Sequence, residues 1–157
     1  MSTPRCSIVI PAKNEWDSIT AVLLRVSEGV SLSFECLVVV DDDDDPTVES
    51  VEELASGDPR FVVVVNRSGV GPAAAIKAGI RESRAPVVVV TMADGSDDPR
   101  SIDDLVRLVE RGVVVAAASR YMAGGQRVSV DRLASMIGAA AGKSLAVFPV
   151  PDVALRS

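Results

Sequence analysis

The stretch Leu37-Val-Val-Val-Asp-Asp-Asp-Asp-Asp45 joins a short apolar run to five consecutive aspartates, and it decides the fold. A valine run of this length, bounded by polar residues, is typical of a strand buried on both faces. A second stretch, Val87-Val-Val-Val-Thr-Met-Ala-Asp-Gly-Ser-Asp-Asp98, repeats the change from valine to acid. Two buried strands that each end in acidic residues predict a parallel sheet with polar groups gathered beyond its carboxyl edge.

Other apolar runs extend the same pattern along the chain. We expect strands at residues 7–10, 37–40, 61–65, 87–90 and 113–117. Apolar residues at helical spacing lie between them, and the stripes are Ile19, Val22, Leu23 and Val26, then Val48, Val51 and Leu54, then Ile102, Leu105, Val106 and Val109. The alternation of strand and helix predicts an α/β fold: a mostly parallel, Rossmann-like sheet, doubly wound, with helices on both faces.

Polar residues before these stripes serve as helix start signals. We expect N-caps at Ser18, Thr47 and Ser101, and a capping box between Ser101 and Asp104.

Length and composition restrict the class of protein. The chain has 157 residues, 48% of them hydrophobic, which suits one core and a single domain over residues 1–157. Acidic residues outnumber basic ones by 22 to 16 and aromatic residues make up 3%, so nucleic acid is not an expected partner. The sequence contains no histidine, which excludes catalysis and metal binding through imidazole.

The two cysteines and the N-terminus favour a domain inside the cell. Cys6 and Cys36 lie in or beside apolar runs and lack a metal-binding spacing, so we expect them to pack as small hydrophobic residues. The first residues hold too short an apolar stretch for a signal peptide, and 18 consecutive apolar residues occur nowhere. The expected location is the cytoplasm. Arg132 and Lys143 form a weak basic face that would allow peripheral contact with the inner membrane surface.

The acidic residues differ in what their places in the chain imply. Asp41 and Asp42 follow directly after a strand, where side chains meet a ligand, whereas Asp43 to Asp45 read as a solvated acidic turn. Close carboxylates repel one another, so this turn needs counter-charges or hydrogen-bond donors.

The second acidic stretch suits a metal. Asp94, with Ser96, is the expected ligand of Mg²⁺ or Mn²⁺, cations that take a few carboxylates together with substrate phosphates. Asp97 and Asp98 are expected to cap the turn into the next helix.

Five motifs taken in order resemble family 2 glycosyltransferases of the GT-A fold, and polyprenyl-phosphate (dolichol-phosphate) mannosyl- or glucosyltransferases in particular. They are Ser7-Ile-Val-Ile-Pro-Ala-Lys-Asn-Glu15, Leu37-Val-Val-Val-Asp-Asp42, residues 66–79, Val87-Val-Val-Val-Thr-Met-Ala-Asp94 and Ser119-Arg-Tyr-Met-Ala-Gly-Gly125. The resemblance covers residues 7–152, and it is the combination that is specific.

The resemblance implies roles for individual residues. Pro11, Ala12, Asn14 and Glu15 match the segment that lies against the base and ribose of a nucleotide-sugar, and Asp42 matches the aspartate that contacts the base. Asp94 matches the last acid of an Asp-x-Asp motif that binds the metal on the diphosphate. Arg120 and Arg132 would face the phosphate of donor or acceptor, because a guanidinium holds phosphate oxygens bidentately.

The sequence departs from the family pattern at two places, and a third feature bears on the acceptor. Met92 replaces the first acid of Asp-x-Asp, and the run 41–45 replaces the usual Asp-Asp-Gly-Ser. Residues 150–157 resemble the start of a segment that continues further in relatives, so the domain is short at its C-terminus. The resemblance implies transfer of a sugar with inversion, to a lipid phosphate that is already anionic and needs no catalytic base.

Two other functions remain open. Gly69-Val-Gly-Pro-Ala-Ala74 followed by Asp94 mimics a dinucleotide-binding fingerprint, although residues 66–68 loosen its turn. A domain that binds nucleotide-sugars without turnover is the other alternative, supported by Met92 and the short C-terminus. The sequence does not choose between GDP and UDP or between mannose and glucose, and it does not identify the acceptor.

Overall fold

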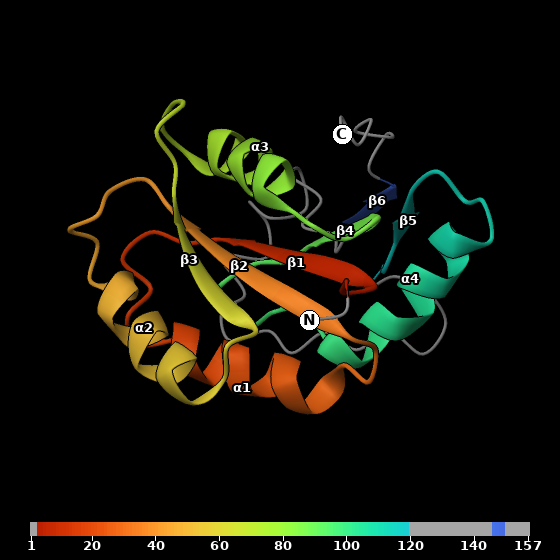
Figure 1. The fold of residues 1–157 in the computed structure, drawn as a ribbon, viewed down its shortest axis with the longest axis horizontal. Coiled ribbons are helices and arrows are strands. Elements are labelled where there is room, and N and C mark those ends of the chain that lie inside the picture. The colour runs from red at the N-terminus through yellow and green to blue at the C-terminus, as the bar shows by residue number, and fades with distance from the viewer. Residues whose placement is uncertain (1–2, 120–145, 150–157) are drawn as a thin grey trace, which may run out of the picture.

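The computed structural model describes residues 3–119 and 146–149, which form one sheet with helices on both faces (Figure 1). The strands are β1 (Cys6–Pro11), β2 (Phe34–Val40), β3 (Phe61–Val65), β4 (Val87–Val90), β5 (Ala116–Ala117) and β6 (Ala146–Pro149). The helices are α1 (Ile19–Gly29), α2 (Thr47–Gly57), α3 (Pro72–Glu82) and α4 (Ile102–Glu110), with a 3₁₀ turn, η1 (Pro99–Ser101), before α4.

The order of the strands places β1 near the middle of the sheet. In the described residues the order is β3-β2-β1-β4-β6-β5. β3, β2, β1 and β4 run parallel, and β6 is antiparallel to both β4 and β5. The chain moves from β1 outward to β2 and β3, then returns to pair β4 with the other side of β1. The carboxyl ends of β1 and β4 therefore flank the topological switch point, where ligands of such sheets bind.

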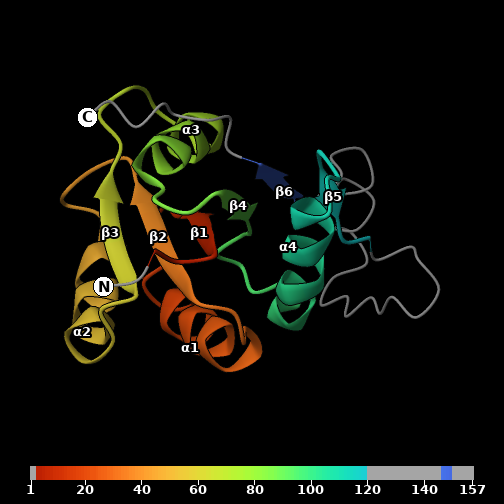
Figure 2. The same cartoon turned by 45° about the vertical axis from the view of Figure 1, so that its right-hand side comes forward.

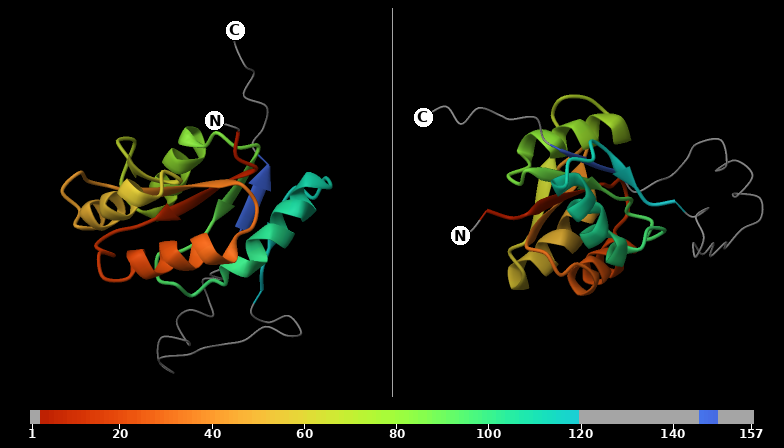
Figure 3. Two further views of the ribbon diagram at one scale, coloured as in Figure 1. Left: turned by 60° about the horizontal axis from the view of Figure 1, so that its bottom comes forward. Right: turned by 90° about the vertical axis from the view of Figure 1, so that its right-hand side faces the viewer.

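Helices cover the sheet unequally on its two faces. α1, α2 and α4 pack on one face around Ile8, Ile10 and Val38, while α3 packs on the other face against Val9 and Val39 (Figures 1 and 2). Figure 3 shows the same layers from two further directions. The predicted stripes of α1 and α4 are buried throughout, whereas in the α2 stripe only Val51 is fully buried. The mostly parallel α/β fold expected from the sequence is confirmed.

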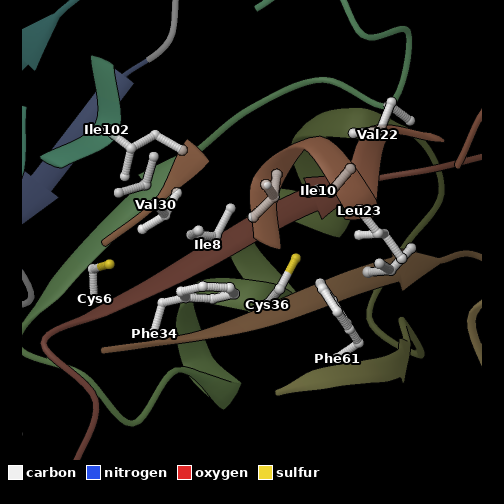
Figure 4. Close-up of a cluster of buried hydrophobic side chains, with 14 of the residues drawn as sticks. Cys6, Ile8, Ile10, Val22, Leu23, Val30, Phe34, Cys36, Phe61 and Ile102 are labelled. Carbon is white, nitrogen blue, oxygen red and sulfur yellow. The ribbon is translucent and has the colours of Figure 1, made fainter. Parts of the chain in front are cut away.

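The larger core contains both cysteines. Cys6 and Cys36 have no exposed surface and lie among Ile8, Phe34 and neighbouring apolar side chains (Figure 4). Burial raises the pKa of the Cys6 thiol to about 12, and it raises that of Cys36 as well. The expected packing of both residues as small hydrophobic groups is confirmed.

The fifth predicted strand is wrong in its length and burial. The structure has β5 at two residues, and Val113, Val114 and Val115 are exposed. These valines follow the end of α4, and Gly112 there has φ of 101°. The valine run predicted a buried strand. In the structure the three valines form the exposed connection between α4 and β5, and β5 pairs with β6, which is distant in the sequence.

Two of the three predicted N-caps are correct in position, and none of the three makes the expected side-chain cap bond. Ser18 and Ser101 occupy N-cap positions without a side-chain cap bond, and Thr47 is the first helical residue rather than the cap. The capping box of Ser101 and Asp104 does not form, because the Asp104 carboxylate accepts a hydrogen bond from Arg107 at 2.9 Å instead.

Candidate functional site

An open cleft of about 360 Å³ lies at the carboxyl ends of β1 and β2. Residues after both strands line it, together with one residue from the loop between β3 and α3: Lys13, Asn14, Asp41, Asp42, Asp44, Asp45, Pro46 and Val70. The loops that follow β1 and β2 lie side by side at the left of Figure 1. Four of the eight lining residues are aspartates, and Lys13 is the one basic residue among the described residues that line the cleft.

The six residues expected to contact a nucleotide divide into two groups. Asn14, Asp41 and Asp42 line the cleft. Pro11 and Ala12 are buried instead, and the Ala12 amide donates to the Val39 carbonyl at 2.9 Å, which continues the pairing of β1 with β2. These two residues therefore set where the chain leaves the sheet.

The sixth residue, Glu15, binds to the protein itself. It is half-buried, its amide donates to Thr47 Oγ1 at 2.9 Å, and its carboxylate accepts from Ser18 at 2.7 Å. Glu15 thus joins the start of α1 to the start of α2.

The segment after β1 has an unusual backbone at Asn14. Its φ is 55°, the left-handed region, which asparagine tolerates better than most residues. The Asn14 amide donates to both carboxylate oxygens of Asp45, at 3.0 and 3.2 Å. This contact joins the loop after β1 to the loop after β2.

Four of the five aspartate carboxylates are held, each by a different contact. Asp41 accepts from the Gly71 amide at 2.8 Å and from the Asn66 side chain at 3.2 Å, so it ties β2 to the loop before α3. The Asp42 carboxylate accepts from the Asp44 amide at 3.2 Å in a local turn. Asp43 forms an ion pair with Arg67 at 2.7 Å. The expected need for donors and a counter-charge in this loop is therefore met.

Asp45 contradicts its interpretation as part of a solvated turn. It is half-buried and accepts from the Thr47 amide at 2.9 Å in addition to the Asn14 amide. Burial alone would raise the pKa of Asp45, but the hydrogen bonds from Thr47 and Asn14 and the charge of Lys13 outweigh it and lower that pKa. The signal in the sequence was Asp-Pro-Thr at a helix start, where an acid before proline caps the first turn.

The loop after β4 presents Asp94 to solvent. Asp94 is exposed, and its Oδ1 accepts from the Ser96 amide at 3.0 Å. Arg25 on α1 donates to the carbonyl oxygens of Gly95 at 2.7 Å and Asp97 at 3.2 Å, so it fastens this loop to the helix. The sequence pattern gave no signal for Arg25, because the contact spans 70 residues.

Asp97 and Asp98 do not share the capping role expected of both. The Asp98 carboxylate accepts from the Arg100 amide at 3.1 Å and caps η1, as predicted. Asp97 reaches backward instead, and its carboxylate accepts from Thr91 Oγ1 at 2.9 Å and from the Met92 amide at 3.3 Å. It therefore closes the loop that carries Asp94 and does not cap a helix.

The donor set at Asp94 suits a hard divalent cation with few protein ligands. Among residues 3–119, no three acidic or cysteine side chains gather into a group able to hold a metal ion. Mg²⁺ and Mn²⁺ are commonly held by one or two carboxylates plus phosphate oxygens and water. Asp94 fits that pattern, with Met92 standing where a second acid would be. Arg120 and Arg132, expected to face phosphate, lie outside the described residues.

The charge of the cleft determines what can lie in it. Carboxylates accept hydrogen bonds from base N–H groups and ribose hydroxyls but repel phosphate. A bound nucleotide would therefore place its nucleoside against the acidic residues after β2 and its phosphates elsewhere. The β4 end, with Asp94 and its loop, lies across β1 from β2.

Comparison with known families gives a match over most of the chain. A family model described as glycosyl transferase family 2 matches residues 7–146. A dolichol-phosphate mannosyltransferase of Pyrococcus furiosus is 32% identical over 123 residues, which cover 78% of this chain and 35% of that protein. A polyprenol monophosphomannose synthase of Mycolicibacterium smegmatis is 34% identical over 128 residues, which cover 78% of this chain and 48% of that protein. The chain thus spans about a third to a half of the length of these relatives.

Solved structures share the fold at lower identity. A mannosyltransferase from Pyrobaculum calidifontis in complex with GDP-Man and Mn²⁺ has a TM-score of 0.66 and 21% identity, over 95% of this chain and 45% of that one. A glucosyl-3-phosphoglycerate synthase from Mycobacterium tuberculosis with Mn²⁺, UDP-glucose and phosphoglyceric acid has a TM-score of 0.62 and 19% identity, over 93% and 57%. Both are GT-A glycosyltransferases, so the GT-A fold expected from the sequence is confirmed.

Proposed function

The chain belongs to glycosyl transferase family 2, and we propose that it transfers a sugar from a nucleoside-diphosphate sugar to a polyprenyl phosphate with inversion. The observation that carries this proposal is the pairing of two features at the carboxyl edge of the sheet, on either side of β1: the acidic cleft after β1 and β2, and the exposed Asp94 after β4. The first suits a nucleoside, and the second suits a metal on the diphosphate.

The donor would lie across the carboxyl ends of three neighbouring strands. Asp42, which is exposed, would accept from the base, and Asn14 would lie beside the ribose. The diphosphate would then point across β1 to Asp94. GDP-mannose and UDP-glucose are the donor classes that we propose, because mannosyl and glucosyl transferases both share this fold.

A divalent cation, Mg²⁺ or Mn²⁺, would be held by Asp94, with Ser96 beside it, and would stabilise the charge that develops on the departing nucleoside diphosphate. The hydrogen bonds of Arg25 and Asp97 to this loop support the proposal, because they would hold the Asp94 carboxylate in place for the metal.

The acceptor follows from what the nucleophile needs. A polyprenyl phosphate carries its own negative charge, so its oxygen attacks the anomeric carbon without a general base. The bond from that carbon to the diphosphate breaks as the new bond to the acceptor oxygen forms on the opposite face. Nucleoside diphosphate leaves, and the configuration inverts. Several relatives are named for polyprenyl-phosphate acceptors, which supports this choice.

An approach to the membrane surface would bring the lipid acceptor to the cleft. No helix among the described residues is long and apolar enough to span a bilayer. We propose peripheral contact, with Arg120 and Arg132 as the groups that meet the acceptor phosphate.

A domain that binds the donor without turnover is the second candidate. Met92 favours it, because the loss of one carboxylate weakens the site for the metal. The dinucleotide reading has less support, since its glycine-rich segment follows β3, the edge strand, and not β1 or β4, the two strands that flank the switch point.

Transfer of labelled sugar separates these functions. The purified chain is incubated with GDP-mannose or UDP-glucose carrying a radiolabelled sugar, Mn²⁺ and a short polyprenyl phosphate, and lipid-linked label is extracted. We expect label in the lipid with one of the two donors, and its loss in Asp94→Ala. The control Asp104→Ala, an exposed acid on α4, should transfer normally. Donor binding without transfer would favour the non-catalytic domain, and tight NAD binding alone would contradict both.

A further inference from the structure

Two hydrogen bonds connect the segment after β1 with the start of α2, and a third joins their acceptors, Asp45 and Thr47. The Asp45 carboxylate accepts from the Asn14 amide at 3.0 Å and from the Thr47 amide at 2.9 Å. The Thr47 hydroxyl in turn accepts from the Glu15 amide at 2.9 Å. We call these three contacts the Asp45 latch. They hold two consecutive backbone amides of one loop against a helix more than 30 residues later in the sequence.

The segment that the latch holds would not keep its conformation unaided. Asn14 has a positive φ, a backbone state that most residues populate poorly. Lys13 and Asn14 are exposed, so little packing restrains them. A carboxylate that accepts from backbone amides makes stronger hydrogen bonds than a neutral acceptor does. Thr47 is fully buried, which fixes the far end of the latch in the core.

The latch does more than a helix cap would do. A cap on α2 needs the contact between Asp45 and the Thr47 amide, which spans two residues. The contacts to Asn14 and Glu15 reach beyond α2, to the loop after β1. Their effect is on Asn14, a residue that lines the cleft.

We propose that Asp45 is a positioning residue for nucleotide binding. It acts directly on the Asn14 amide, and indirectly on Glu15 through Thr47, whose hydroxyl accepts from the Glu15 amide, so that the loop after β1 closes the nucleoside end of the cleft. The inference rests on the proposed function, and it assigns affinity for the donor, not the chemical step, to this carboxylate. Loss of the latch should raise KM for the nucleotide-sugar and leave kcat nearly unchanged.

The variant Asp45→Ser separates this role from capping. Serine supplies one short oxygen that supports the same local turn at Thr47, but it does not also bridge to Asn14. Asp58→Ser is the matched control. The Asp58 carboxylate accepts from the Arg60 amide two residues on, the same local geometry, at the amino end of β3 and away from the cleft.

Calorimetric titration with GDP-mannose and UDP-glucose in the presence of Mn²⁺ measures the affinity, and amide hydrogen exchange reports on the loop. We expect Asp45→Ser to bind about ten- to a hundredfold more weakly than the wild type, the usual loss when a supporting group is removed. The amides of Asn14 and Glu15 should exchange faster in this variant. Asp58→Ser should bind as the wild type does.

The outcomes distinguish the latch from the proposed function. Unchanged affinity in Asp45→Ser, with the wild type binding donor, would overturn the latch. A wild type that binds neither donor would overturn the proposed function instead. Amide hydrogen exchange would then be the measurement that tests whether the latch holds the loop. In that case faster exchange confined to Asn14 and Glu15 would support a latch on this loop, and unchanged exchange would contradict it.

Discussion

Three of the five aspartates after β2 are stabilised by donors from separate parts of the chain. Asp41 binds the loop before α3, Asp43 binds Arg67, and Asp45 binds the loop after β1. Each contact relieves repulsion between carboxylates and joins one loop of the cleft to another. Asp42 is exposed in the cleft and remains the residue that we propose for the base.

Met92 provides a test of the metal loop at the scale of one residue. The variant Met92→Asp adds a second carboxylate to the loop that presents Asp94. Since carboxylate count tunes the affinity of such sites, we expect roughly tenfold tighter Mn²⁺ binding in the presence of nucleoside diphosphate. Calorimetry measures the change. Leu108→Asp, which places the same charge on an exposed part of α4, is the control. Equal Mn²⁺ affinity in Met92→Asp and the wild type would remove this loop from metal binding.

The two cysteines should be inert in the folded protein. Both thiols are buried, and burial raises the pKa of Cys6 to about 12, so little thiolate forms near neutral pH. We expect an aromatic disulfide reagent to leave the native chain unlabelled and to label both cysteines in urea. Ala73→Cys, on the exposed side of α3, is a positive control that should label at once. Rapid labelling of the native wild type would show that the core opens.

At residue scale, the strand-end rule pointed to Asp41 and Asp42 after β2 and to the loop after β4 that carries Asp94. Asp41 and Asp42 do line the cleft, and Asp94 is exposed, but the role of each toward a ligand stays a prediction. Asp45 and Arg25 were missed, because their partners lie 31 and 70 residues away and no periodic pattern encodes such contacts. Asp97 was predicted to cap a helix because it precedes one in the sequence. Its carboxylate instead accepts hydrogen bonds from Thr91 and Met92, at the end of β4.

At the scale of elements, α3 approaches the sheet more closely than a side chain on Gly79 would allow. A Cβ placed there would lie 2.4 Å from Val9 Cγ1 and 3.0 Å from Val39 Cγ2. Gly79→Ala should therefore destabilise the fold by about 1–3 kcal/mol through overpacking. Urea unfolding measures this loss.

Gly57→Ala is the matched control for this prediction. Gly57 is the last residue of α2, and a Cβ there would meet nothing within 4 Å. Alanine favours the helix over glycine by about 1 kcal/mol in helix interiors, so the variant should be neutral or more stable than the wild type. Equal destabilisation by the two variants would contradict the close approach of α3.

The predicted ends of the strands were most accurate where the strand coincides with an apolar run in the sequence. β3 and β4 match the predicted ranges 61–65 and 87–90, and β1 and β2 are longer than expected. The length of β5 was overestimated, because a run of valines is buried only where another element of the protein covers it. β6 pairs with β4 across more than 50 residues, and the sequence pattern contained no signal for that pairing.

At the scale of the whole molecule, acid should unfold the chain below the usual range of aspartate titration. Hydrogen bonds from Arg60 and Arg100 lower the pKa of Asp58 and Asp98, and the Asp45 pKa is lowered although burial opposes it. A depressed pKa stabilises the fold above the unfolded value of 3.8 and loses that effect as pH falls through the folded value.

The free energy of unfolding should therefore be insensitive to these three groups from neutral pH down to about pH 4 and should fall below it. Urea titrations at a series of pH values measure this dependence. Asp58→Asn should flatten the acid branch, because the variant lacks one of the titrating carboxylates. Stability that rises on acidification below pH 4 would contradict the charge-assisted contacts.

The central claim is that the nucleoside of a nucleotide-sugar lies in the acidic cleft after β1 and β2. Backbone amide NMR shifts recorded while a donor is added with Mn²⁺ test it most directly. GDP-mannose or UDP-glucose should shift the amides of residues 13–14, 41–42, 44–45 and 70, which line the cleft, and also that of Asp94. Shifts confined to other parts of the sheet, or shifts in the cleft with NAD but with neither donor, would contradict the account.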